Sequence, residues 1–275
     1  MKLFYLDLKS IVLIAMFVLI SNVSFSKESN VKLLSHDWSF NGFFGKFDRA
    51  SLQRGYQVYK EVCASCHSMN LLSYRNLGEK GGPEFTTEEV KAIASQFEVT
   101  DGPNNDGEMF QRPGKPSDRF VSPYLNVNAS RAANGGAYPP DMSVLVKARP
   151  GGSDYIYSVL MGYEQKTPEN IKLEEGVYYN KYMTGNKIRM ASPLSEGVIE
   201  YTDGTKAGQE QMAKDVVTFL TWAAEPHLET RKELGFKSVI YLLILTILVY
   251  LIKKKIWLRI CLLYTSPSPR DFEAS

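Results

Sequence analysis

The chain contains two segments in which apolar residues recur with the period of an α-helix. Within residues 47–67, apolar side chains return every three or four positions behind Asp48, a residue type that caps helices. These positions are Leu52, Tyr56, Tyr59, Val62 and Cys63. The second stripe, which ends before Pro226, consists of Met212, Val216, Phe219, Leu220 and Ala223. We predict two amphipathic helices that pack together, because Gly55 in the first allows a close backbone approach.

Two segments between these stripes have weaker patterns. Residues 86–99 begin with Thr-Thr-Glu-Glu, which predicts a capped amphipathic helix on the surface. Residues 101–120 are rich in Asp, Asn, Gly and Pro, which predicts a loop with many turns. The acidic residues of this loop suggest calcium as an alternative, but they do not follow the twelve-residue EF-hand pattern.

An apolar run lies near the N-terminus. Residues 11–20 are apolar, follow Lys2 and Lys9, and precede the small residues of Ser-Phe-Ser. This order is typical of a secretory signal peptide, which we place at residues 1–26. An uncleaved membrane anchor is the alternative, and it gives the following body the same exported topology.

A second apolar run lies near the C-terminus. Residues 238–252 carry no charge, and a helix of about 18 residues counted from Gly235 would be roughly 27 Å long, enough to span a bilayer. Three lysines at 253–255 follow, and the positive-inside rule places them in the cytoplasm. We predict a transmembrane anchor with its basic flank at residues 236–258, with a buried core helix as the alternative. Residues 261–275 contain Ser-Pro-Ser-Pro, which cannot continue a helix, and we treat them as a doubtful tail, an artefact of the sequence, without function.

Between the two apolar runs lies one exported body, residues 27–235. In a chain of 275 residues it is long enough for a single sizeable core. The whole chain has a formal net charge of +2, yet this body carries slightly more acidic than basic residues. Since nucleic-acid binding needs a basic face, we predict no nucleic-acid partner.

The most informative short motif is Cys-Ala-Ser-Cys-His at residues 63–67. Its spacing fits a redox disulfide, half of a zinc site or the attachment of a c-type haem. A thioredoxin-like site requires alternating strands and helices, and a zinc site requires two further ligands, whereas His36 and His227 have no cysteine near them. In a haem site, Cys63 and Cys66 bond to the two vinyl groups of the porphyrin and His67 binds the iron. We therefore favour one covalently attached haem c.

The sixth position of the iron has several candidates. They are His36, His227 and the nine methionines, each of which has core packing or another structural role as its alternative. Met190 lies in an irregular loop just before Pro193. A thioether held on such a loop is a soft axial ligand that raises the reduction potential.

Longer segments resemble a known family. The sequences RAANGGAYPPDMS (131–143) and MAKDVVTFLTWAAEP (212–226), in this order and before a single terminal anchor, are similar to the cytochrome c1 family, the haem subunits of the cytochrome bc1 complex. The similarity extends over roughly residues 36–258. It implies a mainly α fold, with a class I cytochrome c-like haem domain, long irregular loops and one C-terminal transmembrane helix.

The resemblance also implies roles for individual residues. Cys63 and Cys66 match the thioether cysteines, and His67 matches the proximal iron ligand. Met190 matches the axial methionine, although Ser192 stands where the family has the first of two prolines. Arg149 matches an arginine that pairs with a haem propionate, with a solvated surface charge as its alternative. Other residues expected to line the pocket are Tyr155, Asn134 and the turn at residues 139–140.

Single-electron transfer is the function that this resemblance implies. The donor would be the Rieske iron–sulfur protein and the acceptor a c-type cytochrome, within ubiquinol–cytochrome c reductase and beside its cytochrome b subunit. The haem domain would lie on the periplasmic side of a bacterial inner membrane, and no substrate chemistry is expected on this chain alone. The acidic residues near Met190 either dock a basic cytochrome or are simply solvated; they are Glu174, Glu175, Glu196, Glu200 and Asp203. Another membrane-anchored c-type cytochrome and an exported thiol oxidoreductase are the alternative functions.

Overall fold

The computed structural model describes residues 31–169 and 171–264, with side chains described as far as Leu258. The predicted signal peptide and most of the C-terminal tail lie outside these residues. Six α-helices provide most of the regular structure of the described chain: α2 (Arg49–Glu61), α3 (Thr87–Ala94), α4 (Val127–Ala133), α5 (Gly152–Met161), α6 (Gln209–Ala224) and α7 (Leu228–Tyr264). Long loops and three short 3-10 helices connect them, so the predicted mainly α class is confirmed.

The first predicted helix forms, but it ends before the cysteine motif. The Asp48 carboxylate accepts a hydrogen bond from the Ala50 N–H at 3.1 Å, as expected for a helix cap, and α2 then runs to Glu61. Leu52, Tyr56 and Tyr59 are buried, as their spacing predicts. The motif itself begins in the 3-10 helix η1 (Cys63–Ser65) rather than in a continuation of α2.

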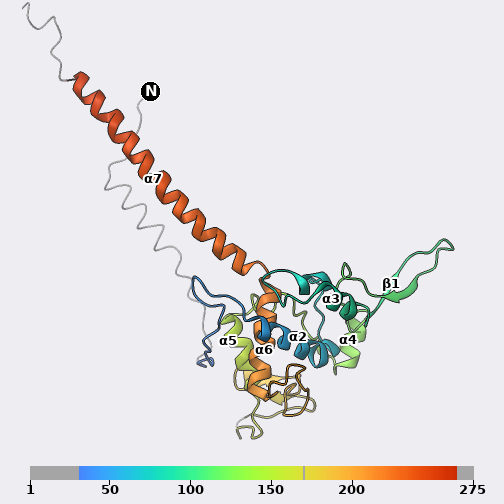
Figure 1. Cartoon of the computed structure of the whole chain (residues 1–275). Helices are drawn as coiled ribbons and strands as arrows, with labels where there is room; N and C mark the ends of the chain where they lie inside the picture. The colour runs from blue at the N-terminus through green and yellow to red at the C-terminus, as the bar shows by residue number, and fades with distance from the viewer. Residues whose placement is uncertain (1–30, 170, 265–275) are drawn as a thin grey trace, which may run out of the picture. The chain divides into compact units, whose positions relative to one another are not determined.

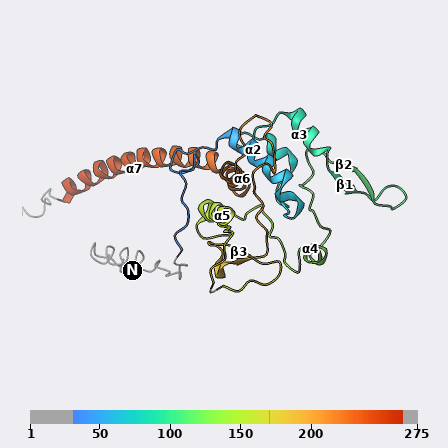
Figure 2. The same ribbon diagram turned by 90° about the horizontal axis from the view of Figure 1, so that it is seen from below.

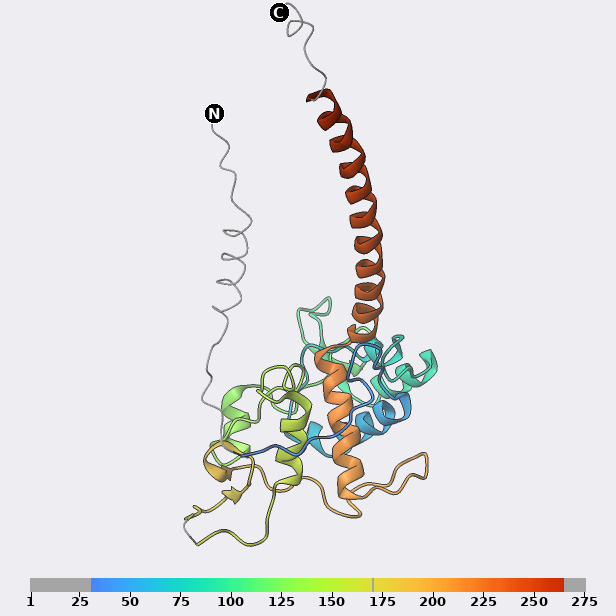
Figure 3. The same cartoon turned by 90° about the vertical axis from the view of Figure 1, so that its left-hand side faces the viewer.

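Helix α6 packs across α2 and also contacts α5 (Figures 1 and 3). All five residues of its predicted apolar stripe are buried. At the crossing, a Cβ atom added to Gly55 would lie 2.1 Å from the Asp215 carbonyl oxygen, so only glycine fits there. The fully buried Asp215 carboxylate accepts hydrogen bonds from Arg54 at 2.9 Å and from the Tyr201 hydroxyl at 2.9 Å, which satisfies its charge.

The predicted surface helix is confirmed as α3, although it is shorter than expected. The Thr86 hydroxyl accepts from the Glu89 N–H at 3.2 Å, and the Glu89 carboxylate accepts from the Thr86 N–H at 2.8 Å, which completes a capping box. The helix ends at Ala94.

The segment that follows α3 is more regular than its composition predicts. It contains an antiparallel hairpin of β1 (Glu98–Asp101) and β2 (Phe110–Pro113), visible in Figure 2, with Val99 opposite Arg112. A second, very short antiparallel pair joins β3 (Tyr178–Tyr179) and β4 (Lys187–Ile188), next to the 3-10 helix η3 (Thr184–Asn186). The remaining 3-10 helix, η2 (Tyr74–Gly78), precedes α3.

Arg112 fixes the base of the β1–β2 hairpin and sets its response to pH. Its guanidinium pairs with Asp101 and binds both carboxylate oxygens of Asp118, at 2.6 and 3.0 Å. These hydrogen bonds hold the pKa of Asp118 at about 2. Because the pKa is lower in the folded chain, the stabilisation is present above the ordinary pKa of aspartate and is lost as the pH falls through about 2. We expect an NMR titration to show Asp118 titrating near pH 2, and to return toward its ordinary value in Arg112→Gln; an unchanged titration in the variant would contradict this assignment.

Helix α7 is longer than the predicted membrane anchor. It begins at Leu228, shortly after Pro226, and continues to Tyr264, because no proline interrupts it before residue 267. Its segment Leu228–Leu258 is long and apolar enough to cross a membrane. The first turn is tied to α2, where the Arg49 guanidinium pairs with the Glu229 carboxylate at 2.8 Å.

Candidate haem-binding site

The backbone of the Cys-Ala-Ser-Cys-His motif forms one tight turn after α2. The N–H groups of Cys66 and His67 both donate to the Cys63 carbonyl oxygen, at 3.1 and 2.9 Å. This turn brings the two thiols and the imidazole together within five residues, as the sequence predicts.

The His67 ring is buried and held in one orientation. Its Nδ1 lies 2.8 Å from the Pro140 carbonyl oxygen, so Nδ1 carries the proton and donates it. Among the described residues Nε2 has no hydrogen-bond partner, and this is the nitrogen available to a metal. Burial lowers the pKa of His67, so the imidazole is neutral at pH 7, as a metal ligand must be.

The loop that supplies the Pro140 carbonyl is itself fastened to the motif. The Asp141 carboxylate accepts from the Ser68 hydroxyl at 2.8 Å, the Asn70 N–H at 2.9 Å and the Ser143 N–H at 2.8 Å. Burial opposes ionisation of Asp141, yet these hydrogen bonds lower its pKa below the ordinary value. The turn at residues 139–140 was predicted to line the pocket, but Asp141 was not predicted, because a single loop aspartate has no distinguishing pattern.

Cys63 and Cys66 form no disulfide with each other. Desolvation raises the pKa of Cys63 to about 12, and the neighbouring Cys66 adds to the rise. A thiol oxidoreductase needs the opposite, a thiolate stabilised near neutral pH. The environment of Cys63 therefore argues against the redox alternative.

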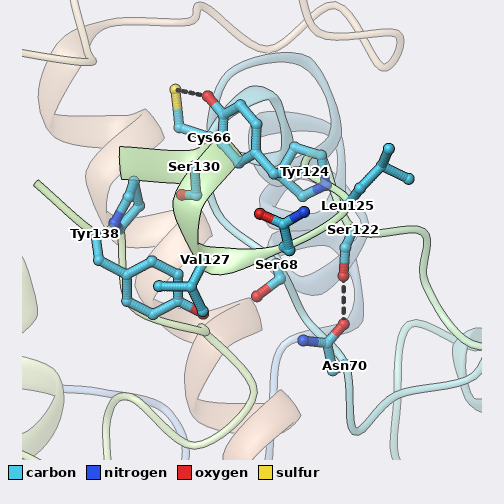
Figure 4. A pocket seen from close by; sticks show the side chains of 12 residues that line it. Cys66, Ser68, Asn70, Ser122, Tyr124, Leu125, Val127, Ser130 and Tyr138 are labelled. Carbon is cyan, nitrogen blue, oxygen red and sulfur yellow. Dashed lines mark hydrogen bonds between the residues drawn. The ribbon is translucent and has the colours of Figure 1, made fainter. Parts of the chain in front are cut away.

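A hollow of about 190 Å³ opens beside Cys66 (Figure 4). The Tyr124 hydroxyl lies 3.9 Å from the Cys66 sulfur, and the Asn134 side-chain amide donates to this hydroxyl at 3.1 Å. Tyr138 and Pro139 also line the hollow. Its volume is below the roughly 300–1,000 Å³ typical of cofactor sites. The hollow is therefore large enough only for the part of a cofactor that lies next to Cys66.

The loop that contains Met190 is connected to the His67 side of the site. The Tyr163 hydroxyl donates to the Met190 carbonyl oxygen at 3.0 Å, and the Arg189 guanidinium donates to the Gly135 carbonyl oxygen at 3.1 Å. Gly135 belongs to the same loop as Pro140, which orients His67. These contacts place the Met190 loop against the loop that orients His67, while the role of the Met190 sulfur remains a prediction.

The other predicted residues lie around α5. Arg149 is exposed just before the helix, and its guanidinium donates to the Ala148 carbonyl oxygen at 3.1 Å. Tyr155 is half-buried and its hydroxyl donates to the Met183 sulfur at 3.3 Å. His36, by contrast, stacks edge-on against Trp38 with ring centroids 4.8 Å apart, and His227 is exposed beside α7.

This arrangement fits a covalently bound c-type haem. Two thiols on one turn match the two vinyl groups, and a buried neutral imidazole with Nδ1 fixed presents Nε2 to iron. Thus the fold and the site together define a c-type cytochrome. Within the described ranges no group of three or more His, Cys, Asp and Glu side chains is arranged to hold a metal ion without such a cofactor.

Comparison with known proteins identifies the family. The sequence model of the Cytochrome C1 family matches residues 38–260. A Rhodospirillum rubrum protein named cytochrome c1 is 42% identical over 264 residues, covering 90% of this chain and 96% of that protein. A potato protein named cytochrome c1-2, heme protein, mitochondrial, is 51% identical over 215 residues, covering 78% of this chain and 81% of that protein. A Bradyrhizobium diazoefficiens protein named cytochrome b/c1 is 49% identical over 250 residues, or 84% of this chain, which spans only 36% of that longer protein.

The chain therefore belongs to the cytochrome c1 family. Its cofactor is haem c, for which Cys63, Cys66 and His67 form the attachment motif. Among the described residues, one helix, α7, is long and apolar enough to span a membrane, which fits a membrane-anchored member of this family.

Proposed function

We propose that this chain carries single electrons from a Rieske iron–sulfur protein to a c-type cytochrome within a ubiquinol–cytochrome c reductase complex, beside its cytochrome b subunit. The observation that carries the proposal is the fixed His67 ring in a chain of this family, with Nδ1 bound to Pro140 and Nε2 without a hydrogen-bond partner among the described residues. The name cytochrome b/c1 of the Bradyrhizobium relative supports a cytochrome b partner. The haem, when bound, supplies the one-electron couple.

The residues of the chain hold and tune the cofactor. Cys63 and Cys66 would bond covalently to the haem, and His67 Nε2 and the Met190 sulfur would bind its iron. Since the protein would supply both ligands, a substrate would find no open site on the iron, and the chain would transfer electrons without bond chemistry. Tyr155 and Asn134 complete the pocket.

Topology follows from the two apolar runs. A signal peptide at residues 1–26 would export the haem domain, residues 27–235, and the lysines at 253–255 would stay in the cytoplasm. The haem domain would then lie on the periplasmic side of a bacterial inner membrane, where a soluble or anchored c-type cytochrome can reach it.

The acidic residues near Met190 divide into two groups. Asp203 is engaged, since its carboxylate pairs with Arg54 at 3.0 Å. Glu174, Glu175, Glu196 and Glu200 are exposed, and the only ion pair that any of them makes among the described residues is a 3.9 Å contact between Glu174 and Arg189. We assign docking of a basic cytochrome to these four glutamates and not to Asp203.

Membranes that contain the complex provide the direct test. Adding a quinol should reduce the haem of this chain, as seen in the visible difference spectrum, and removing the Rieske protein should abolish that reduction. Ascorbate should still reduce the haem in both samples, which shows that the cofactor is intact. Quinol-driven reduction that persists without the Rieske protein would contradict the proposed donor.

Arg149 is expected to pair with a haem propionate. Its guanidinium is exposed and makes only one hydrogen bond in the described structure, to a backbone carbonyl, so it is available for a carboxylate. Loss of this cation favours the ferric state, so Arg149→Gln should lower the reduction potential by about 10–40 mV, the equivalent of an exposed ion pair of about 0.2–1 kcal/mol. Arg149→Lys keeps the positive charge, so a redox titration should give it a reduction potential close to that of the unchanged chain. Equal reduction potentials for the unchanged chain and both variants would identify Arg149 as a solvated surface charge.

A further inference from the structure

Three phenylalanine rings gather at the start of α7 and face solvent. Phe43 and Phe44 lie 5.0 Å apart between ring centroids, and each lies 5.7 Å from Phe236 of α7. Phe43, Phe44 and Phe236 are 56, 75 and 41% exposed. Three large apolar side chains exposed together are unusual on a soluble surface and indicate a contact surface. We call these residues the phenylalanine cluster.

The loop that carries Phe43 and Phe44 is fastened to α7. The Lys232 ammonium donates to the carbonyl oxygens of Phe40 at 2.6 Å, Gly42 at 2.7 Å and Gly45 at 3.3 Å. Just beyond the loop, the Phe47 N–H donates to the Glu229 carboxylate at 2.8 Å. The position of the cluster along α7 is therefore set by the protein.

Glycines on both sides of the two phenylalanines are required by this loop. Gly42 has a φ of +71°, a left-handed conformation that other residues adopt only with strain. A Cβ atom on Gly45 would lie 1.9 Å from the Asn41 carbonyl oxygen. The segment from Gly42 to Gly45 is thus built to hold two adjacent phenylalanines outward on a tight turn.

The cluster lies at the level where the apolar stretch of α7 begins. Phe236 precedes Ser238, the first residue of the uncharged run, by two positions, or about 3 Å along the helix axis. Since Phe43 and Phe44 pack against Phe236, they share its depth. If α7 spans a bilayer, this depth is the boundary between headgroups and acyl chains.

We propose that the phenylalanine cluster is a membrane contact that inserts into the lipid surface on the haem-domain side and fixes how deeply α7 sits. Lipid is the occupant because the cluster is continuous with the membrane-spanning face of α7. Lys46 and Lys237 are exposed and follow the rings closely in sequence, and the Lys237 ammonium pairs at 2.6 Å with Glu233, one turn toward the haem domain. Such cations can remain among the headgroups while the rings enter the apolar layer. This goes beyond electron transfer and rests only on α7 being a membrane span.

Spin-label accessibility in vesicles tests the proposal with the full haem-loaded chain. In a Cys261→Ser background, where haem occupies the other two cysteines, one label is placed through Phe44→Cys, Met109→Cys or Leu245→Cys in separate samples in phosphatidylcholine vesicles. Met109, between β1 and β2 and away from the hollow beside Cys66, is 60% exposed and serves as the aqueous control, and Leu245 within the span of α7 serves as the lipid control. The visible spectrum confirms that each variant is folded and holds haem.

Oxygen and a water-soluble nickel complex each speed the relaxation of the spin label, but oxygen is concentrated in lipid and the nickel complex stays in water. The ratio of the two enhancements therefore reports contact of the label with lipid. We expect this ratio at Phe44 to be several-fold higher than at Met109 and lower than at Leu245. A ratio at Phe44 equal to that at Met109 would place the cluster in water and overturn the inference. Shielding of Phe44 from both reagents would show that protein covers it, which also overturns the inference. A low ratio at Leu245 would instead show that α7 does not span the bilayer, so failure of the anchor and failure of the contact are distinguishable.

Discussion

Replacing Met190 by alanine in the haem-loaded chain is expected to abolish the ferric methionine–sulfur absorption band and to lower the reduction potential by on the order of 100 mV or more. A thioether stabilises ferrous iron because it is a soft, neutral ligand, and water or a harder ligand in its place favours the ferric state. The variant should keep its haem, since Cys63, Cys66 and His67 are unchanged. Reduced-minus-oxidised spectra and a redox titration measure both effects.

Met183 provides the matched control for this experiment. It lies on the same stretch of chain, between β3 and β4, and its sulfur accepts a hydrogen bond from the Tyr155 hydroxyl at 3.3 Å. Met183→Ala should retain the sulfur band and change the potential little, because its sulfur is already engaged by a pocket residue. If Met183→Ala abolishes the band and Met190→Ala retains it, the two methionines have exchanged roles and our assignment is wrong.

The parts of the fold that were predictable depend on local patterns. The period of the apolar residues placed α2 and α6, and capping residues placed the starts of α2 and α3. The order Cys-x-x-Cys-His located the attachment turn, because haem chemistry requires those groups within a few residues. The crossing of α2 and α6 was also foreseeable, since Gly55 is the one glycine within the first apolar stripe.

The parts that were not predictable depend on distant contacts. The Pro140 carbonyl orients His67 from 73 positions away in sequence, and a backbone oxygen leaves no trace in the residue type. Strands β1 and β2 were missed because Glu98, Asp101 and Arg112 break the alternation typical of strands. Their hairpin is instead held by the ion pairs of Arg112 with Asp101 and Asp118. The continuation of α7 to Tyr264 was missed because we ended the helix at the last residues typical of a membrane anchor.

A single methyl group at the crossing of α2 and α6 is expected to have the largest effect on stability. In Gly55→Ala the new Cβ would lie 2.1 Å from the Asp215 carbonyl oxygen and 2.7 Å from the Phe219 Cβ, both far inside contact distance. The backbone of α6 cannot easily withdraw, because the Asp215 carboxylate is bound by Arg54, Tyr201 and Gln211. We expect a loss of about 3 kcal/mol, at the upper end of overpacking effects, and a melting temperature lower by about 10 °C.

Gly235→Ala separates this steric effect from helix propensity. Gly235 is also helical, but a Cβ there meets no atom within 4 Å, so alanine should gain up to about 1 kcal/mol of helix propensity without a clash. Thermal unfolding of the haem domain, followed by the haem absorption in detergent, should therefore be unchanged or shifted upward by at most about 4 °C in Gly235→Ala and shifted strongly downward in Gly55→Ala. Equal melting temperatures for both variants would mean that α2 and α6 can separate without loss, and that the buried Arg54–Asp215 pair does not hold the crossing in place. Since α2 leads directly into the turn that binds haem, such a result would also remove the physical link between the helix crossing and the geometry of His67.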